Sequence, residues 1–386
     1  MQTTLGTSKL ATFTFQSSLG WSAKEFPDLD SERTLVLVLG ATKYMDDADA
    51  IAELRRRFPR SHFLGCSTAG EIAGSELHDD SLSVAVHRFE HTRVKTAAAP
   101  VRSQEDSFAA GVAIAEQLED PSLRGVFVLS DGLNVNGSEL IRGLNSILPE
   151  SVVVTGGLAG DGDRFKRTWV LKDAIPTSGW VSAVGFYGDR VRIGHGSKGG
   201  WDVFGPERIA TRAEGNVLFE LDGKPALPLY KEYLGERAAG LPATALLFPL
   251  SVWQTGSEDT KVVRTILSID ETTQSMVFAG DIPQGSRAQL MRANFDRLIH
   301  GAGESADMAR NTQDLDQPCL SIAISCVGRR MVLGERTEEE LESTLDVLPA
   351  GTQQVGFYSY GEISPCVDGT CTLHNQTMTL TTIQEQ

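Results

Sequence analysis

The sequence predicts a mixed α/β (α+β) fold, built from repeated strand-helix-strand-strand units that form two related halves with mixed sheets. Three observations support this prediction. Short apolar runs, typical of buried strands, alternate with amphipathic stretches at helical spacing. The order of strand, helix, strand with glycine turn, and extended segment occurs three times along the chain. Two of the glycine turns also resemble each other in sequence, which favours duplication of one unit.

Size and composition are those of an ordinary globular protein. The chain has 386 residues, of which 41% are hydrophobic and 22% are charged. This length predicts two or three domains, or one duplicated plan, and it allows a core that needs neither disulfides nor a structural metal. The composition excludes collagen, a coiled coil, a disulfide scaffold and a disordered chain.

The first unit begins at Thr34–Gly40, a short apolar run that is typical of a buried strand. Residues 47–58 then carry apolar side chains at helical spacing, and Pro59 ends this helix. His62–Ile72 is predicted to be a strand that runs into a glycine turn. Leu82–Phe89 alternates between apolar and polar residues, as a half-buried strand does.

The second unit repeats this order. Gly125–Leu129 is predicted to be a strand, and residues 138–148 form a helix with leucines on one stripe. Val152–Gly162 is another strand that enters a glycine-rich turn. The same sequence of elements in the same order indicates a second copy of the unit.

The third unit lies near the end of the chain. Leu320–Cys326 is predicted to be a strand, and Thr337 with Glu340 forms a capping box that opens the next helix. The following turn, Gly356–Ile363 (GFYSYGEI), aligns with Gly65–Ile72 (GCSTAGEI) of the first unit. The shared glycine and the shared Gly-Glu-Ile indicate one backbone shape that is used twice.

The segment between the second and third units has a different character. Residues 190–222 contain many short extended runs, and Pro228–Leu234 is predicted to be a short helix. Glu236–Pro242 is polar and rich in Ala and Gly, which marks it as the best domain boundary. The predicted domains are therefore 1–235 and 243–386.

Charge and cysteine content narrow the possible partners and compartments. The net charge is −16, and such a surface repels nucleic acid and anionic lipid. The five cysteines are odd in number and sparse, which suits a reducing compartment. No run of apolar residues is long enough to span a membrane, and the opening residues lack the pattern of a secretory signal. We therefore expect a cytoplasmic protein, and a homo-oligomer is possible.

The glycine turns are the candidate ligand sites, because backbone N–H groups can approach a ligand closely there. The turn at Gly156–Gly162 does not match a dinucleotide loop or a phosphate loop. Two readings remain: a tight turn that requires positive φ, or a turn that lines a pocket for another ligand. The predicted ligand-binding residues are Gly65, Cys66, Ser67, Gly156, Gly157, Gly160, Gly356, Tyr358 and Ser359.

An enzyme is the alternative from a different class. Cys66 ends a predicted buried strand and could be a nucleophile, and Asp131 follows another strand and could be a catalytic acid. His62 lies four residues before Cys66, about 13 Å away along a strand, so it cannot serve as the partner base without a bend. A packed thiol and a turn-capping aspartate are the simpler interpretations. We therefore expect that the protein is not an enzyme.

His195 is the candidate metal ligand. It lies in Ile193–Trp201 (IGHGSKGGW), where the flanking glycines would leave room for a bulky planar group and Trp201 could supply an apolar wall. This arrangement could place the imidazole on a haem iron. The alternative is a histidine that satisfies a local hydrogen bond.

These motifs, taken together, resemble those of the FIST family, bacterial sensory proteins with an N-terminal and a C-terminal FIST domain. The matching segments span nearly the whole chain in the family's order. The resemblance implies a signal-transduction input module that binds a small ligand, with amino acids or similar metabolites as the proposed ligands. It assigns residues 1–235 to a FIST N-type domain and residues 243–386 to a FIST C-type domain. The matching segments are residues 65–72, 156–162, 220–226, 289–292, 356–363 and 374–377.

The chain is also similar to the NosP group, free-standing haem-containing nitric-oxide sensors that regulate a partner histidine kinase in trans. That similarity implies a haem b cofactor and nitric oxide as the ligand. The sequence has no CxxCH attachment motif, so the haem would be held without covalent links. A sensor of an amino acid or another small metabolite is the alternative, and its pocket would be made by the glycine turns with Ser67, Tyr358 and Ser359.

Overall fold

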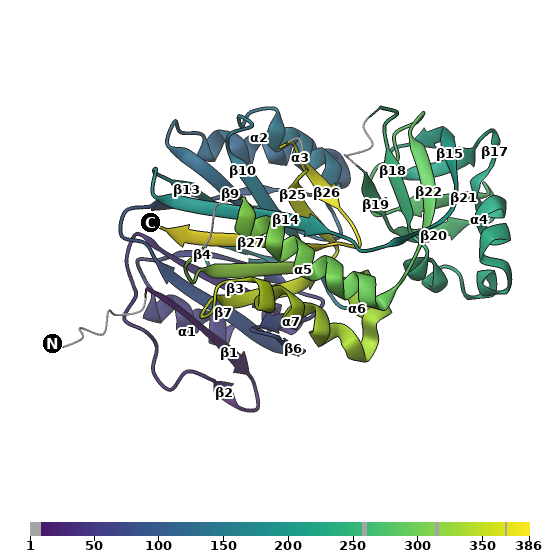
Figure 1. Ribbon diagram of the computed structural model, residues 1–386. Coiled ribbons are helices and arrows are strands. Elements are labelled where there is room, and N and C mark those ends of the chain that lie inside the picture. The colour runs from purple at the N-terminus through teal and green to yellow at the C-terminus, as the bar shows by residue number, and fades with distance from the viewer. Residues whose placement is uncertain (1–8, 257–260, 313–315, 367–368) are drawn as a thin grey trace.

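The protein has a large body and a smaller lobe at one end (Figure 1). The computed structural model describes residues 9–256, 261–312, 316–366 and 369–386. Residues 1–8, which entered the prediction that the chain lacks a secretory signal, lie outside the described residues. Three sheets with helices packed on them form the body, and a fourth sheet forms the lobe. The predicted mixed α/β class is confirmed.

Each sheet of the body has the same plan. The strands of each sheet follow in order from one edge to the other. The first sheet contains β12 (Ile175–Thr177), β11 (Val170–Lys172), β4 (His62–Ser67), β3 (Thr34–Gly40), β7 (Ser81–Arg88), β1 (Leu10–Gln16) and β2 (Gly20–Trp21). The second contains β26 (Cys371–His374), β25 (Gly361–Pro365), β10 (Val153–Leu158), β9 (Leu123–Ser130), β13 (Trp180–Tyr187) and β8 (Arg93–Pro100). The third contains β6 (Glu76–His78), β5 (Glu71–Ala73), β24 (Gln353–Ser359), β23 (Leu320–Cys326), β27 (Met378–Glu385) and β14 (Val191–Lys198).

The shared plan is a hairpin, a parallel pair of strands and two antiparallel strands. The parallel pairs are β3 with β4, β9 with β10, and β23 with β24. Each hairpin belongs to a different unit from the parallel pair that it joins. The first unit's β5–β6 hairpin pairs with β24, the second unit's β11–β12 with β4, and the third unit's β25–β26 with β10.

This exchange closes the three units into a ring, so the repeat is a ring of three rather than the two related halves that the sequence predicted. The physical reason is that the extended segment after each glycine turn does not return to its own sheet. It crosses to the next one and covers an edge that would otherwise be unpaired. The second unit shows this most clearly, because β11 lies in the first sheet and β13 in the second.

Helices cover the outer faces of these sheets. The amphipathic α1 (Asp49–Arg57) packs its apolar side chains on the first sheet, and α2 (Ser107–Leu118) with α3 (Gly137–Asn145) packs on the second. The third sheet carries α5 (Phe295–Asn311) and α7 (Thr337–Val347), with α6 (Val327–Leu333) beside them. Three short 3-10 segments of the body are η1 (Thr42–Met45), η2 (Gln104–Asp106) and η6 (Gly334–Arg336).

The helix predicted at Thr337 is present, but its capping box is not. Thr337 Oγ1 donates to the backbone carbonyls of Gly334 and Arg330 instead of capping the helix. Glu340 is fully buried and forms an ion pair with the equally buried Arg329, at 2.7 Å. Glu340, which was predicted to cap the helix, instead lies in the core. Its ion pair with Arg329 there outweighs a local capping hydrogen bond of about 1 kcal/mol.

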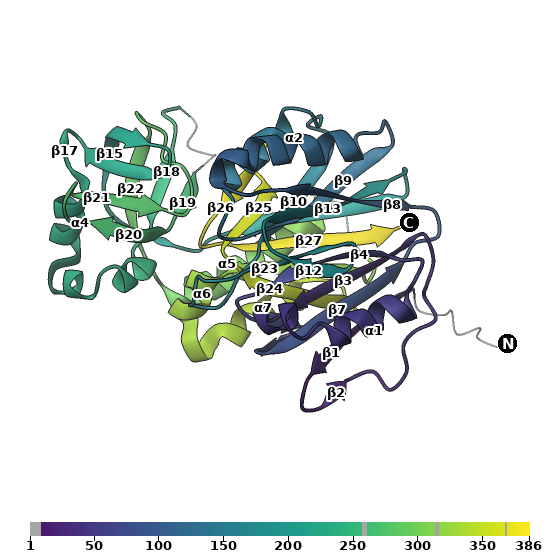
Figure 2. The same cartoon turned by 180° about the vertical axis from the view of Figure 1, so that it is seen from behind.

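The lobe spans residues 202–292 and has its own apolar core. It is inserted between β14 and α5, and Figure 2 shows it beside the body from the opposite side. Glu236–Pro242, the predicted domain boundary, lies inside this lobe. Its elements are β15 (Asp202–Glu214), β16 (Val217–Leu221), β17 (Lys224–Pro225), α4 (Ala226–Leu234), η3 (Gly235–Gly240), η4 (Ala243–Leu247), β18 (Leu250–Trp253), β19 (Val262–Arg264), β20 (Ile266–Asp270), β21 (Ser275–Phe278) and β22 (Arg287–Arg292).

Candidate functional site

The three glycine turns meet at one point, which we call the vertex. They follow β4, β10 and β24, so the vertex lies at the carboxyl ends of all three parallel pairs. A cycle of backbone hydrogen bonds joins them: Ala69 N donates to Tyr358 O, Gly160 N to Ser67 O, and Tyr360 N to Leu158 O, at 2.8, 2.9 and 3.2 Å. The structure therefore brings the three predicted turns together.

The glycines that begin these turns are required by the backbone. A Cβ atom on Gly65, Gly156 or Gly356 would lie 2.1, 1.8 or 1.9 Å from a carbonyl oxygen of the neighbouring parallel strand. Gly160 is similarly confined, with the amide nitrogen of Ala69 2.8 Å from the position of a Cβ. These glycines allow the chains to approach each other, and the neighbouring chain already occupies the space beside them.

The polar side chains predicted to bind a ligand point into the protein. Ser67 Oγ accepts a hydrogen bond from Trp169 N at 3.0 Å, and Tyr358 OH donates to Glu340 at 2.7 Å. Ser359 Oγ donates to Glu362 at 2.6 Å. Ser67, Tyr358 and Ser359 are fully buried, so their hydrogen bonds stabilise the vertex from inside the protein.

Two buried carboxyl groups anchor the vertex, and the sequence analysis did not single them out. Glu71 and Glu362 occupy matching places in the repeated Gly-Glu-Ile, which was the signal that could have revealed them. Glu362 accepts hydrogen bonds from the hydroxyls of Ser359 and Thr377, and Glu71 accepts them from Thr68 and Ser81. Burial raises the pKa of Glu71 to about 7 and that of Glu362 to about 8, and the hydrogen bonds oppose this rise.

The two candidate catalytic residues are also engaged in structure. Cys66 is fully buried, and burial raises the pKa of its thiol well above the ordinary value. Asp131 accepts hydrogen bonds from the backbone amides of Leu133, Asn134 and Gly179, at 2.8, 2.9 and 2.9 Å. Asp131 thereby fixes the loop that follows β9, and this loop forms one wall of the cavity described next.

A cavity of about 160 Å³ lies between the vertex and the lobe, and we call it the vertex cavity. Its size is comparable to that of a pocket that holds a benzene-sized molecule. Walls from both parts of the protein enclose it. The body contributes Gly132, Leu133, Asn136, Leu158, Phe165 and Tyr360 among others, and the lobe contributes Asn216, Leu267, Phe278 and Asp281.

The mouth of the vertex cavity is apolar and partly exposed. Phe165 stacks on Tyr360 with the ring centroids 4.4 Å apart and the planes 14° from parallel, and 47% of Phe165 remains exposed. Leu267 of the lobe is also 47% exposed. Polar groups lie between these walls, where Asn136 donates a hydrogen bond to Asp281 across the interface at 3.3 Å. Apolar walls with a few placed polar groups are typical of small-molecule sites.

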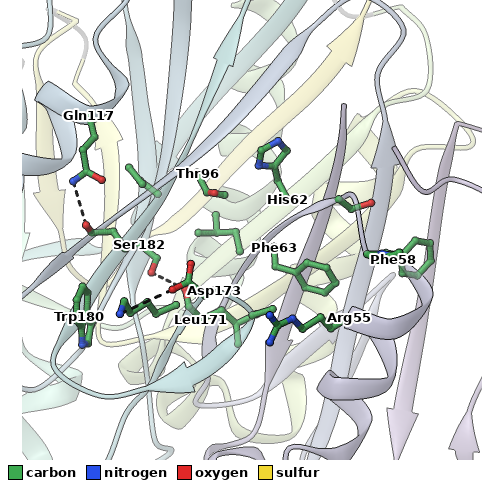
Figure 3. A pocket seen from close by; sticks show the side chains of 18 residues that line it. Arg55, Phe58, His62, Phe63, Thr96, Gln117, Leu171, Asp173, Trp180 and Ser182 are labelled. Atoms are coloured by element: carbon green, nitrogen blue, oxygen red, sulfur yellow. Dashed lines mark hydrogen bonds and ion pairs between the residues drawn. The ribbon is translucent and has the colours of Figure 1, made fainter. Parts of the chain in front are cut away.

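A larger groove of about 460 Å³ lies between the first and second sheets (Figure 3). It includes His62, the first residue of β4, so it lies toward the amino end of that strand and away from the vertex. Several polar groups around it are engaged: Ser182 donates to Leu171 O at 2.7 Å, and Gln117 donates to Ala98 O at 3.1 Å. Ligands of α/β proteins bind at the carboxyl ends of strands, which favours the vertex cavity over this groove.

His195 lies on β14, and the reason given for a haem beside it is wrong. A Cβ on Gly194 or Gly196 would lie 2.1 Å from a carbonyl oxygen of α5, so the flanking glycines make room for this helix and not for a planar group. The His195 ring points to the opposite face, because side chains alternate along a strand. Its Nδ1 is buried without a partner among the described residues, and burial lowers the pKa of the ring.

Within the described ranges, no cluster of three or more His, Cys, Asp or Glu side chains could hold a metal ion. No helix in that same part of the chain is long and apolar enough to cross a membrane.

Two known domain models match consecutive parts of this chain. A FIST N domain model matches residues 34–224, and a FIST C domain model matches residues 226–365. The chain therefore belongs to the FIST family, whose domains are sensory signalling domains. The boundary between the two matches falls at β17, inside the lobe. The narrower resemblance to the NosP group stays a prediction.

Relatives of similar sequence occur in an archaeon and in mycobacteria. An uncharacterized protein of Methanocaldococcus jannaschii is 24% identical over 361 residues, which cover 80% of this chain and 65% of the archaeal protein. An uncharacterized protein of Mycobacterium tuberculosis is 26% identical over 90% of both chains. One of Mycobacterium bovis is 24% identical over 90% of this chain and 89% of its own length.

Proposed function

We propose that this protein is a sensor that binds a small molecule in the vertex cavity and acts through a partner protein. The observation that carries the proposal is the position of the cavity. It lies beside the vertex, against the carboxyl ends of β9, β10 and β24, and is completed by residues of a separate lobe. A ligand there contacts both parts of the protein at once, so its binding energy depends on how the lobe sits on the body.

Signalling then follows from a shift between two arrangements of the lobe. A ligand that fits one arrangement better raises the population of that arrangement by its difference in affinity. The exposed Phe165 and Leu267 lie at the mouth, and their exposure differs between an open and a closed arrangement. A partner that contacts these two side chains therefore binds with an affinity that depends on whether the cavity holds a ligand.

An enzyme using Cys66 or Asp131 is the less favoured reading. A buried thiol with a raised pKa holds little thiolate, which is the reactive form. The carboxylate oxygens of Asp131 already accept hydrogen bonds from three backbone amides. Neither residue has a free acid–base partner beside it in the contacts described above, and the protein is proposed to bind its ligand without turnover.

The finer hypothesis, a haem b sensor of nitric oxide that regulates a histidine kinase in trans, depends on an axial ligand. His195 is the residue that the sequence offers, and its orphaned Nδ1 is the one feature in its favour. Gly194 and Gly196 pack against α5 on the face opposite the ring, so the space that these glycines were expected to leave for a planar group is filled. We therefore place a metabolite ahead of haem. Absorption spectra of protein expressed with added haem test this order: we expect no Soret band that shifts with nitric oxide, and such a band lost in His195→Ala would reverse it.

The sensor proposal is tested by a thermal-shift screen of small metabolites against the full chain and two matched variants. Leu267→Trp fills the vertex cavity, and Leu19→Trp makes the same change at an exposed hairpin tip, where Leu19 is 80% exposed. A ligand of the native state raises the melting temperature. We expect the rise to persist in Leu19→Trp and to disappear in Leu267→Trp. A ligand whose effect survives Leu267→Trp does not bind in the vertex cavity, and the proposal fails.

A further inference from the structure

A second cavity, separate from the vertex cavity, lies between the lobe and the second sheet. Its volume is about 380 Å³, and we call it the Arg264 cavity. The lobe supplies Trp253, Arg264 and Ser286, and the body supplies Ser138 of α3 and Thr372 of β26. It adjoins the vertex cavity through Asp281, which lines both.

Arg264 is a buried cation that forms no ion pair among the described residues, although the nearby Asp281 favours its charged form. Only 5% of the residue is exposed. Its guanidinium donates to three backbone carbonyls, those of Asp281, Val263 and Leu373, at 3.1, 3.3 and 2.9 Å. It makes no ion pair with any residue that the structure describes, and burial lowers its pKa to about 10. A buried charge without an ion-pair partner is unfavourable, so an anionic group placed against Arg264 would stabilise the folded state.

Three other groups at this cavity are hydrogen-bond donors without partners. The indole Nε1 of Trp253 and the hydroxyls of Ser138 and Ser286 are buried, and none has a partner among the described residues. Trp253 is 3% exposed and Ser286 is fully buried. An indole N–H can only donate, and a hydroxyl can donate as well as accept. Leaving such a buried group unpaired is unfavourable, so each of them favours a ligand atom that accepts its hydrogen.

The amino end of α3 adds positive potential on the same side. Ser138 is near the start of this nine-residue helix, whose cap residue Asn136 already accepts hydrogen bonds from the amides of Ser138 and Glu139. The helix dipole places partial positive charge there. A guanidinium, two hydroxyls, an indole N–H and a helix amino end thus surround one space, and all of them favour an acceptor that carries negative charge.

The remaining walls limit the ligand further. Val252, Val262 and the ring of Trp253 provide apolar surface. Among the described residues that line the cavity, Asp281 is the one carboxylate, and Asn136 donates to its Oδ1. It would repel a second negative charge on the ligand. A single carboxylate with a short apolar tail satisfies both the donors and these walls.

We infer that the Arg264 cavity binds a short-chain monocarboxylate. The carboxylate lies against Arg264 and accepts from Trp253 and Ser286, and the apolar tail lies against the valines. None of the four donor side chains lines the vertex cavity, so the inference does not depend on the proposed sensor function. Either site can be absent while the other remains.

Thermal unfolding of the full chain, at fixed ionic strength and pH, tests this inference with sodium propionate as the probe. Acetate and butyrate extend the series. Succinate, which carries a second carboxylate, and inorganic phosphate, which has no apolar tail, serve as comparison anions. We expect propionate at saturation to raise the melting temperature by about 2 °C or more, and succinate and phosphate to raise it less. Arg264→Met should lose the propionate effect, and Arg56→Met, a change on the exposed face of α1, should keep it.

Trp253→Phe gives a second readout if Arg264→Met does not fold. It keeps an aromatic ring and removes the N–H donor, so the propionate effect should shrink. Propionate should also change the tryptophan fluorescence of the unaltered chain, and this change should be absent in Trp253→Phe. The inference is wrong if propionate has no effect, if its effect is equal in Arg264→Met or unchanged in Trp253→Phe, or if phosphate has the larger effect.

Discussion

Replacing Glu362 by glutamine should change how stability depends on pH, because this carboxyl group is buried among neutral donors. Its pKa is about 8, against an ordinary value of 4.5. The folded state therefore holds the proton over about 3.5 pH units in which the unfolded chain has lost it. At about 1.4 kcal/mol per unit, this corresponds to about 5 kcal/mol in total.

The sign follows from linkage. A folded-state pKa above the unfolded value means that stability from this group is fully present below pH 4.5 and is lost as the pH rises through 8. About 3.5 kcal/mol of that loss falls between pH 5 and pH 8, by the same relation. Glu362→Gln removes the titration and keeps a side chain that can accept and donate. Its free energy of unfolding, relative to the unaltered chain, should therefore rise by about 3.5 kcal/mol over this interval.

Urea unfolding followed by circular dichroism at pH 5, 6, 7 and 8 measures this difference. The quantity of interest is its change with pH, since any constant cost of the amide cancels. Glu116→Gln, an exposed change on α2, is the control and should show no such rise. Glu71→Gln, at the equivalent place in the first unit, should behave as Glu362→Gln does. A flat difference for Glu362→Gln between pH 5 and pH 8 would refute the reasoning.

Two further substitutions probe the packing around the third sheet. Arg329→Met leaves the buried Glu340 without its ionic partner and should lower the free energy of unfolding by about 3–5 kcal/mol at pH 7, measured by urea unfolding; no loss would contradict the importance of this buried ion pair. Gly196→Ala puts a Cβ 2.1 Å from Ser305 O on α5 and should lower the melting temperature, whereas Gly205→Ala, whose Cβ meets nothing closer than 3.5 Å, should have little effect. Equal melting temperatures for the two glycine variants would contradict the close packing of α5.

Much of the architecture was accessible from the sequence because local patterns encode it. The apolar run Thr34–Gly40 and the amphipathic stretch that became α1 form the elements that were predicted. The helix α2 was missed, because alanine and glycine replace a clear apolar stripe. Gly111 and Gly143 let α2 and α3 approach until a Cβ on either would meet a backbone oxygen at 2.2 Å. Contacts this close depend on the partner helix, which no local pattern reveals.

The candidate site was accessible only in part. The turns that carry the repeated Gly-Glu-Ile do meet, but they do not share one backbone shape throughout: Gly70 has a φ of +134°, and its counterpart Gly361 has no positive φ. Which side chains face a cavity depends on the exchange of hairpins between units and on the lobe, and neither is visible in spacing. Asp281 and Arg264 come from the lobe and lie beside residues more than 100 positions away, such as Asn136 and Leu373.

Hydrogen exchange with and without a ligand found in the thermal-shift screen tests the central claim most directly. If the ligand lies between the vertex and the lobe, amides in residues 158–165 and in residues 276–281 should gain protection together. Protection confined to residues 55–64 and 171–183, which border the groove of Figure 3, would place the ligand elsewhere and contradict the account.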